Sequence, residues 1–332
     1  MYKEHLSGYR SWPQLDHASE WILIPENMGP RLCIDETEIN GDLFTIVSNP
    51  EAHGKCGSVV AMVRGTKASD VVRILLMIDE TVRKEVKEVT MDFSESMQAI
   101  VTAAFPEATL VIDKFHMLNL AIEAADELRL RNKREAVADT RRKEREFNAK
   151  VKECKKRRAA WKKSHKRKHN GKKRGRKPVY TGKYKPEVLE NGDTVVELLT
   201  RSKYLLSQPG NRWTEKQKAR AKILFERYPK LKEAYSLVCS LRCVFDGKYD
   251  RKTGEEKLHG WYQSVTGCTV REIKAVRDTI KKREEHVLNY FINRSTNAPA
   301  ESLNSKIKCF RAELRGVSDP AFFMYRVSTV LG

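Results

Sequence analysis

Three acidic side chains in this sequence have the type and the setting that divalent-metal chemistry requires. Asp35 ends the apolar run "LCID", Asp92 ends "VTMD", and Glu301 stands near the start of a helical segment in "NRSTNAPAESLNSKIKCF". Breaking or transferring a phosphodiester requires a nucleophile that loses a proton and a leaving oxygen that gains charge, and two Mg²⁺ ions about 4 Å apart serve both ends. Mg²⁺ prefers oxygen and usually takes one or two carboxylates per ion, so these acids suit two Mg²⁺ ions, with Mn²⁺ as a substitute.

Each of the three acids also has an ordinary structural explanation. Asp35 suits a strand end or a turn, Asp92 suits the N-cap of a following helix, and Glu301 is a first-turn acid that the helix dipole stabilises. Their joint placement carries the metal hypothesis, because carboxylates at strand ends face the open edge of an α/β sheet, where ligands bind.

A fourth acid is a rival for the second position. Asp113, in "VIDKFH", also ends an apolar strand, whereas the strand count favours Asp92. We therefore expect Asp113 and His116 to support the site or to position DNA, with a buried core histidine as the alternative for His116. Asn304 lies one helical turn after Glu301 and is expected to help hold the site or the DNA backbone.

The elements that must position these acids follow from the apolar pattern. Two strand-forming runs flank Asn40–Gly41, which is a strong hairpin signal, and "SVVAMVRG" is a third strand. A helical spacing in "KASDVVRILLMIDETVRKEV", a strand "EVTMDF", a capped helix "SESMQAIVTAAF" and a strand "ATLVIDKFH" follow. The order β-β-β-α-β-α-β, followed by a helix, is that of a ribonuclease-H-like mixed sheet, so we predict an α/β fold with the strands of Asp35 and Asp92 as neighbours.

The middle of the chain has a different composition and is predicted to be entirely helical. A long charged helix is followed by helices at about 194–207, 214–227, 229–244 and 269–290. In this segment Trp213 and Trp261 are expected in the core, with base stacking as the alternative. The predicted domains are an irregular segment 1–30, a catalytic domain 31–117 and 286–332, and a helical insertion domain 118–285 with a basic loop 155–178.

The basic loop is the most strongly charged part of the chain. Fourteen of the 23 residues from Lys155 to Lys177 are Lys or Arg, and none is acidic. Such charges neutralise phosphates without reading bases, although a solvated loop without a partner is the alternative. The residues predicted to bind DNA are Lys155, Lys156, Arg157, Arg158, Lys162, Lys163, Lys166, Arg167, Lys168, Lys172, Lys173, Arg174, Arg176 and Lys177.

The whole-chain composition agrees with a nucleic-acid partner. The 332 residues carry a formal net charge of +20, and a strongly basic chain favours a polyanion. The seven cysteines are scattered, which indicates a reducing compartment. No apolar run approaches the roughly 20 residues that span a bilayer. We expect a soluble, cytoplasmic and nucleoid-associated protein without a membrane partner.

Two blocks, "VTMDFSESMQAIVTAAFPEATLVIDKFHMLNLA" and "RSTNAPAESLNSKIK", resemble the DDE transposases of bacterial insertion sequences. The group is the ISL-three group, which is related to Mutator-like transposases, and the resemblance extends from about residue 31 to the C-terminus. It implies a ribonuclease-H-like catalytic domain interrupted by a helical insertion, and metal-dependent cutting and joining of DNA at transposon ends. The family's acids fall on Asp35, Asp92 and Glu301. The resemblance also implies a homo-oligomer that pairs two transposon ends before joining them to a target.

The sequence departs from the family at its N-terminus. Asp35 comes too early to leave room for the zinc-binding and helix-turn-helix region that reads transposon ends in such proteins, so either a companion DNA-binding protein is the partner that reads the ends or the region is lost. Two other functions remain as alternatives. One is a ribonuclease-H-like nuclease or junction resolvase without strand transfer, and the other is a catalytically inactive DNA-binding protein.

Overall fold

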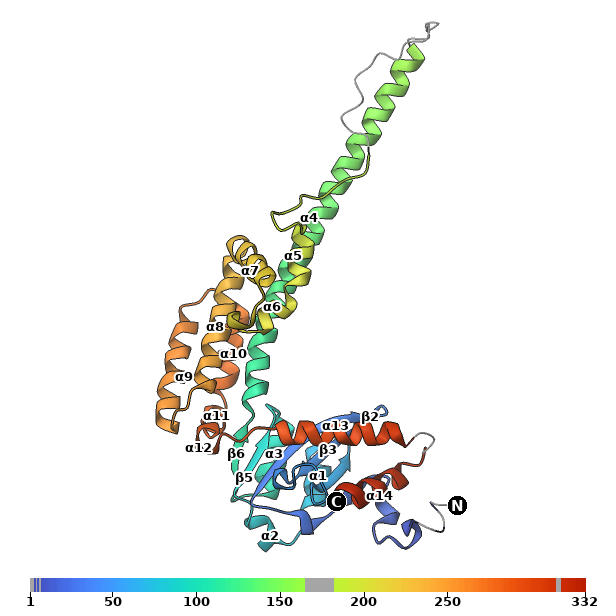
Figure 1. Cartoon of the computed structure of the whole chain (residues 1–332), viewed down its shortest axis with the longest axis vertical. Helices are drawn as coiled ribbons and strands as arrows, with labels where there is room; N and C mark the ends of the chain where they lie inside the picture. The colour runs from blue at the N-terminus through green and yellow to red at the C-terminus, as the bar shows by residue number, and fades with distance from the viewer. Residues whose placement is uncertain (1–2, 4, 6, 165–181, 315–317) are drawn as a thin grey trace. The chain divides into compact units, whose positions relative to one another are not determined.

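The computed structural model describes residues 3, 5, 7–164, 182–314 and 318–332 (Figure 1). The chain divides into two compact units, which are described separately. The sheet unit comprises Met1–Leu120, Ser240–Thr266 and Val276–Gly332, and the helical unit comprises Ala121–Cys239 and Gly267–Ala275. The predicted insertion, 118–285, was defined by sequence composition, and it stays a prediction.

The sheet unit contains a six-stranded mixed sheet of order β1-β4-β3-β2-β5-β6. The strands are β1 (Trp21–Leu23), β2 (Arg31–Ile39), β3 (Asp42–Ser48), β4 (Val59–Arg64), β5 (Glu88–Met91) and β6 (Thr109–Ile112). The predicted hairpin joins β2 to β3, where Asn40 and Gly41 have φ angles of 56° and 88°. Both residues are left-handed, as a tight two-residue hairpin turn requires. β2, β3 and β4 are antiparallel, as predicted.

The second half of the sheet is parallel. β5 pairs with β2 and β6 pairs with β5, so β2, β5 and β6 run side by side in one direction. Helices α1 (Ala68–Leu75) and α2 (Glu80–Lys84) connect β4 to β5, and α3 (Glu95–Ala104) connects β5 to β6. The predicted α/β class and ribonuclease-H-like order are therefore confirmed.

The N-terminal segment differs from its prediction. Residues 1–30 were expected to be irregular, but Trp21–Leu23 form β1, which pairs antiparallel with β4 at the edge of the sheet. Ile22 is fully buried there. A strand of three residues is too short to produce an alternating apolar pattern, which explains why the sequence did not reveal it.

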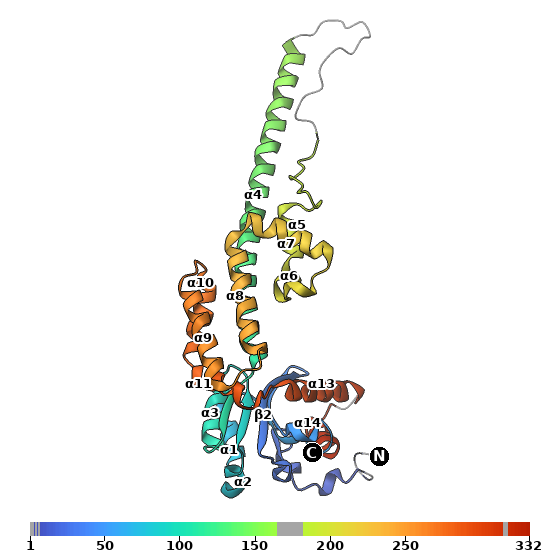
Figure 2. The ribbon, with the colours of Figure 1, turned by 60° about the vertical axis from the view of Figure 1, so that its left-hand side comes forward.

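Helices cover both faces of the sheet. In Figure 2, α1 and α3 lie on one side of β2, and α13 (Ala298–Glu313) and α14 (Pro320–Leu331) lie on the other. The core under α13 and α14 joins Ile46 and Met62 of the sheet to Leu303 and Ile307 of α13. The helix that carries Glu301 is therefore fixed to the sheet by apolar packing.

The sheet unit also contains α9 (Arg251–Thr266), α11 (Glu284–Leu288) and α12 (Tyr290–Asn293). Helix α9 was not predicted from the sequence, because Gly254 and Gly260 weaken its helical pattern. Gly254 is buried, and a Cβ atom on it would lie 2.6 Å from the Phe291 ring. The glycine thus permits close packing of α9 against α12.

The longest helix, α4 (Lys114–Ser164), has 51 residues and is unbroken in Figure 1. No Gly or Pro interrupts it, and charged pairs such as Lys143–Asp139, 2.8 Å apart, stabilise its exposed surface. The other described helices are α5 (Val195–Arg201), α6 (Lys203–Ser207), α7 (Glu215–Arg227), α8 (Pro229–Asp246) and α10 (Arg271–Lys281). Capping boxes at Thr194 and Thr214 begin α5 and α7. Among the described residues, no helix combines the length and the apolar character that crossing a membrane demands.

The apolar packing beneath α13 leads to a prediction about the free energy of unfolding. Ile307 is fully buried, so Ile307→Ala is expected to lower the free energy of unfolding by about 3 kcal/mol, through lost burial and the cavity left behind. The control is Ile292→Ala at a site that is 54% exposed, where a change below about 0.5 kcal/mol is expected. Urea unfolding measures both, and equal effects of the two substitutions would contradict the packing described for α13.

Candidate active site at the sheet edge

Three aspartates come together where the parallel pairing of β2, β5 and β6 stops. Asp35 does not end its strand, as the sequence suggested, but lies inside β2, opposite Ile46 of β3. Cys33 of β2 is level with Thr90 of β5, and Met91 of β5 is level with Ile112 of β6. Asp35 comes two residues after Cys33, Asp92 directly follows β5, and Asp113 directly follows β6. Because neighbouring strands are about 4.8 Å apart, the order β2-β5-β6 puts Asp92 between the other two.

Helix α13 brings a fourth acid and two amides to the same edge. The Asn304 side chain donates a hydrogen bond of 2.7 Å from Nδ2 to Asp35 Oδ2. Asn297, the N-cap residue, donates from Nδ2 to Asp92 Oδ1 at 3.1 Å and to the Ile34 carbonyl at 3.3 Å. Glu301 lies in the first turn of α13, and its backbone N–H donates to the Asn297 carbonyl at 3.0 Å. The start of α13 is therefore attached directly to the strand ends.

His116, in the first turn of α4, lies between two of the aspartates. Its Nε2 is 2.9 Å from Asp92 Oδ2, and its Nδ1 is 3.2 Å from Asp113 Oδ2. Hydrogen bonds to Asp113 and Asp92 raise the pKa of His116 to about 10. The imidazole is thus protonated at neutral pH and offsets part of the negative charge at the edge.

Burial opposes ionisation of Asp35. The residue is 7% exposed, and burial, followed by the negative charge of Asp92, raises the pKa of Asp35 to about 7. The charge of Glu301 contributes in the same direction, which indicates that Glu301 lies close enough to act on Asp35. Burial, with the charges of Asp113 and Asp35, also raises the pKa of the Cys33 thiol to about 12.

The donor set fits hard divalent cations. Asp113 Oδ1 and Asn304 Oδ1 are buried, and neither has a hydrogen-bond partner among the described residues. Ligand atoms of Asp113, His116 and Glu301 also lie within 4.8 Å of one another. Unpaired buried oxygens are costly, and a cation that prefers oxygen ligands would satisfy them. The residues at this edge are therefore of the kind that Mg²⁺ or Mn²⁺ requires.

The structure brings the candidate acids and their predicted supports into one cluster. Its members are Asp35, Asp92, Asp113, His116, Glu301 and Asn304. Their division into metal ligands and supporting residues stays a prediction. The hydrogen bond from Asn297 to Asp92 was not predicted from the sequence. The only signal was that Asn297 stands at the start of the helical segment, close to Glu301.

The predicted DNA-binding residues divide into two groups. Lys155, Lys156, Arg157, Arg158, Lys162 and Lys163 lie on α4 and are exposed, so the prediction of a loop from residue 155 was wrong up to Ser164, where the chain is helical. Lys166, Arg167, Lys168, Lys172, Lys173, Arg174, Arg176 and Lys177 lie outside the described residues. Their role in DNA binding stays a prediction.

The structure places the two tryptophans differently: Trp261 is in the core, as expected, whereas Trp213 is only half-buried. Trp261 is 2% exposed, as expected of a core residue. Trp213 Nε1 donates to the Leu205 carbonyl at 3.0 Å, and its ring stacks on Tyr235 with centroids 5.2 Å apart. Base stacking, the alternative for these residues, stays untested for the half-buried Trp213.

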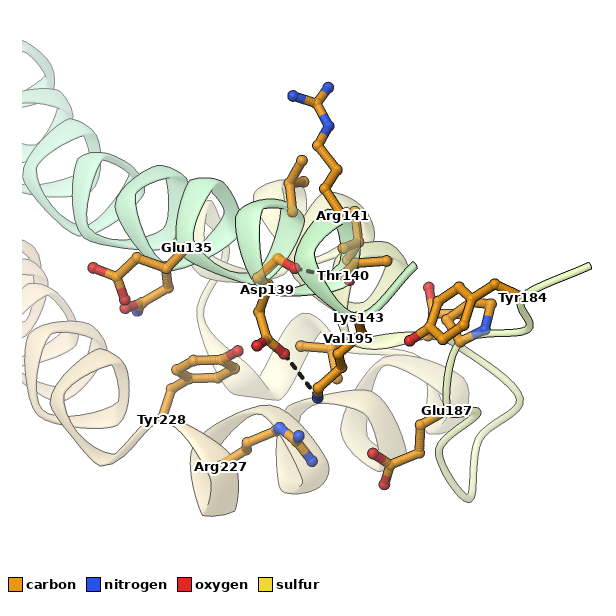
Figure 3. A pocket seen from close by; sticks show the side chains of 16 residues that line it. Glu135, Asp139, Thr140, Arg141, Lys143, Tyr184, Glu187, Val195, Arg227 and Tyr228 are labelled. Carbon is orange, nitrogen blue, oxygen red and sulfur yellow. Dashed lines mark hydrogen bonds and ion pairs between the residues drawn. The ribbon is translucent and has the colours of Figure 1, made fainter. Parts of the chain in front are cut away.

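A pocket of about 530 Å³ lies entirely within the helical unit (Figure 3). Tyr184 and Tyr228 border it, and Asp139 and Lys143 of α4 pair across 2.8 Å in its wall. It contains none of the residues predicted for catalysis.

Because the pKa of Asp35 is raised, the stability of the metal-free protein is expected to depend on pH. Asp35 binds its proton more tightly in the folded protein, where its pKa is about 7, than in the unfolded chain, where its pKa is 3.8. The protonated Asp35 side chain therefore makes its full contribution to stability below pH 3.8, and this contribution is lost as the pH rises through about 7. Asp35→Asn stays neutral, so it is expected to raise the free energy of unfolding by up to about 4 kcal/mol at pH 8, and by less than half of that at pH 5. Urea unfolding with a chelator present tests this, and a gain that does not grow with pH would contradict it.

The comparisons with known proteins gave one match. The family model of the ISL-three group of DDE transposases, described as "Transposase", matches residues 32–190 and 183–327. No curated protein and no solved structure matches the chain significantly. The family match covers most of the chain and includes every residue of the acidic cluster. The chain therefore belongs to the ISL-three group of DDE transposases.

Proposed function

We propose that this transposase cuts DNA strands at the ends of an insertion sequence and joins the cut ends to target DNA, with Asp35, Asp92 and Glu301 holding two divalent cations. The observation that carries the proposal is the convergence of four carboxylates on one sheet edge, beside a buried Asn304 oxygen that has no hydrogen-bond partner among the described residues. Such an arrangement is costly without cations and useful with them.

Bound Mg²⁺ would activate the attacking oxygen and stabilise the leaving oxygen of the phosphodiester. The protein's own residues orient the acids. Asn304 directs one oxygen of Asp35, Asn297 directs one oxygen of Asp92, and His116 bridges Asp92 to Asp113. Because α13 is packed on the sheet, Glu301 faces these acids from a rigid support.

Two observations support Asp92 as the second acid. β5 is the direct neighbour of β2, whereas β6 is one strand further away. The Asp92 side chain is also 20% exposed, and a ligand of a DNA-bound cation must be reachable from solvent, whereas the Asp113 side chain is wholly buried. In favour of Asp113 is its grouping with His116 and Glu301 within 4.8 Å. We assign Asp113 to the support of His116, and this assignment is open to test.

Substitution of the acids tests the assignment. Asp92→Asn and Glu301→Gln are each expected to lower strand cleavage at least about 10³-fold in Mg²⁺, because each removes a charged ligand at similar volume. Asp113→Asn is expected to lower it much less, since the amide oxygen can still accept from His116. The assay uses DNA that carries the element's own ends. Full activity in Asp92→Asn with complete loss in Asp113→Asn would reverse the assignment.

A second arm separates transposition from nuclease activity. Pre-cleaved ends and a supercoiled target give joined products only if the enzyme has strand-transfer activity. Cleavage without joined products would favour a ribonuclease-H-like nuclease, and no Mg²⁺-dependent activity in the wild type would favour an inactive DNA-binding protein.

The basic residues on α4 make a separate prediction about DNA binding. Each lysine or arginine that neutralises a phosphate contributes about 0.9 to the slope of log K against log salt concentration. Replacing Lys155, Lys156 and Arg158 with Gln is expected to reduce that slope by about 2 to 3 units, with little dependence on DNA sequence. The matched control is Lys216→Gln, Lys218→Gln and Lys222→Gln on α7, outside the basic loop, which is expected to keep the slope. An equal reduction in both variants would contradict a specific role for the basic residues at the end of α4.

A further inference from the structure

A second group of metal-ligand side chains lies on the helices of the sheet unit. Glu255 and His259 are on α9, and Glu284 begins α11. One ligand atom from each lies within 4.8 Å of the others, and His259 Nε2 is 2.7 Å from Glu284 Oε1. None of the three belongs to the acidic cluster at the sheet edge.

The backbone holds these side chains together. Glu255 and His259 are four residues apart, so they share one face of α9. Close packing at Gly254, where a Cβ would lie 2.6 Å from the Phe291 ring, fixes α9 against the segment that directly follows α11. The relative position of the three side chains is therefore set by packing and does not depend on a bound ligand.

A buried hydroxyl is directed at the same place. Tyr262 lies one turn beyond His259 on α9, and its ring centroid is 5.7 Å from that of His259. The residue is 7% exposed, and its hydroxyl faces the Glu284 carboxylate without meeting any partner at full hydrogen-bond geometry within the described ranges. Burial, the negative charge of Glu284 and a loose hydrogen bond to that carboxylate raise the pKa of Tyr262. A buried hydroxyl that is only loosely bonded is costly, and a group bound between Tyr262 and Glu284 would satisfy it.

The two carboxylates also differ from their neighbours in sequence. Glu255 and Glu284 are half-buried, whereas Glu256 and Glu285 are exposed. In the described part of this strongly basic chain, no lysine or arginine forms an ion pair with Glu255 or Glu284. Two half-buried carboxylates with only an imidazole between them leave negative charge that is not offset.

We propose that Glu255, His259 and Glu284 bind one Zn²⁺ ion, with the Tyr262 hydroxyl hydrogen-bonded to the water that completes the coordination. One imidazole nitrogen and two carboxylate oxygens suit zinc in four-coordinate geometry, whereas Mg²⁺ prefers oxygen alone. Ligand atoms around tetrahedral zinc are about 3.3 Å apart, since each lies about 2.0 Å from the ion. To admit the ion, the His259–Glu284 distance of 2.7 Å need lengthen by well under 1 Å, and the Glu255 ligand atom, which lies within 4.8 Å of the other two, must settle at a similar spacing.

The site would join α9 to α11. Helix α11 packs against β6, and the adjacent Asn289 donates from Nδ2 to the Leu110 carbonyl at 2.9 Å. β6 is the strand that leads to Asp113. Zinc at this position would thus stabilise the support of the acidic cluster without taking part in its chemistry.

Calorimetric titration of the full-length protein with Zn²⁺ in excess Mg²⁺ tests the proposal. Wild type is expected to bind one more equivalent of Zn²⁺ than His259→Ala, Glu255→Gln or Glu284→Gln, whereas the neighbouring substitutions Glu256→Gln and Glu285→Gln retain that equivalent. Tyr262→Phe is expected to keep the stoichiometry and to weaken the dissociation constant about tenfold, as loss of a group that orients a metal-bound water does.

The difference in stoichiometry isolates this site from any other zinc bound by the chain. Glu284→Gln preserves side-chain volume, and circular dichroism checks its folding, so loss of binding cannot be confused with unfolding. If Glu284→Gln binds as much Zn²⁺ as wild type, or if Glu256→Gln loses the same equivalent, the site does not exist as proposed.

Discussion

Electrostatic repulsion among carboxylates is the constraint on which this structure depends. Asp92 and Asp113 follow the ends of β5 and β6, Asp35 lies inside the neighbouring β2, and Glu301 faces them from α13. In the protein alone, burial and mutual repulsion keep Asp35 partly protonated near neutral pH, and the His116 imidazolium offsets part of the charge. The fold withstands this cost because apolar packing of Leu303 and Ile307 holds α13 on the sheet. Stability and function are therefore opposed at the sheet edge, as they commonly are in active sites.

The supporting amides explain how repelling groups stay in place. An asparagine donates to a carboxylate without adding charge, so it can orient the acid while leaving the acid's affinity for a cation intact. Asn304 does this for Asp35 and Asn297 does it for Asp92, and both amides come from the first two turns of α13. A single helix thus carries one acid and aligns two others, which links the far C-terminal part of the chain to strands more than 200 residues earlier.

The sequence allowed the strand order and the acidic cluster to be predicted, because strand-forming runs, the Asn40–Gly41 turn and acids that follow apolar strand residues are local signals. The expectation that Asp35 ends its strand was wrong, since β2 continues to Ile39. β1 was missed because three residues form no periodic pattern. α9 was missed because Gly254 and Gly260 have low helix propensity, although Gly254 is needed there for close packing against Phe291. The complete burial of Asp113 and the bond from Asn297 to Asp92 depend on packing between distant segments, so no spacing in the sequence reveals them. The grouping of Glu255, His259 and Glu284 was missed for the same reason.

Anomalous diffraction from crystals grown with Mn²⁺ and DNA ends tests the central claim most directly, because it locates the cations themselves. The account predicts two peaks at the sheet edge, with oxygens of Asp35, Asp92 and Glu301 as their protein ligands. Peaks bound by Asp113 and Glu301 without Asp35, or no peak at this edge, would contradict it.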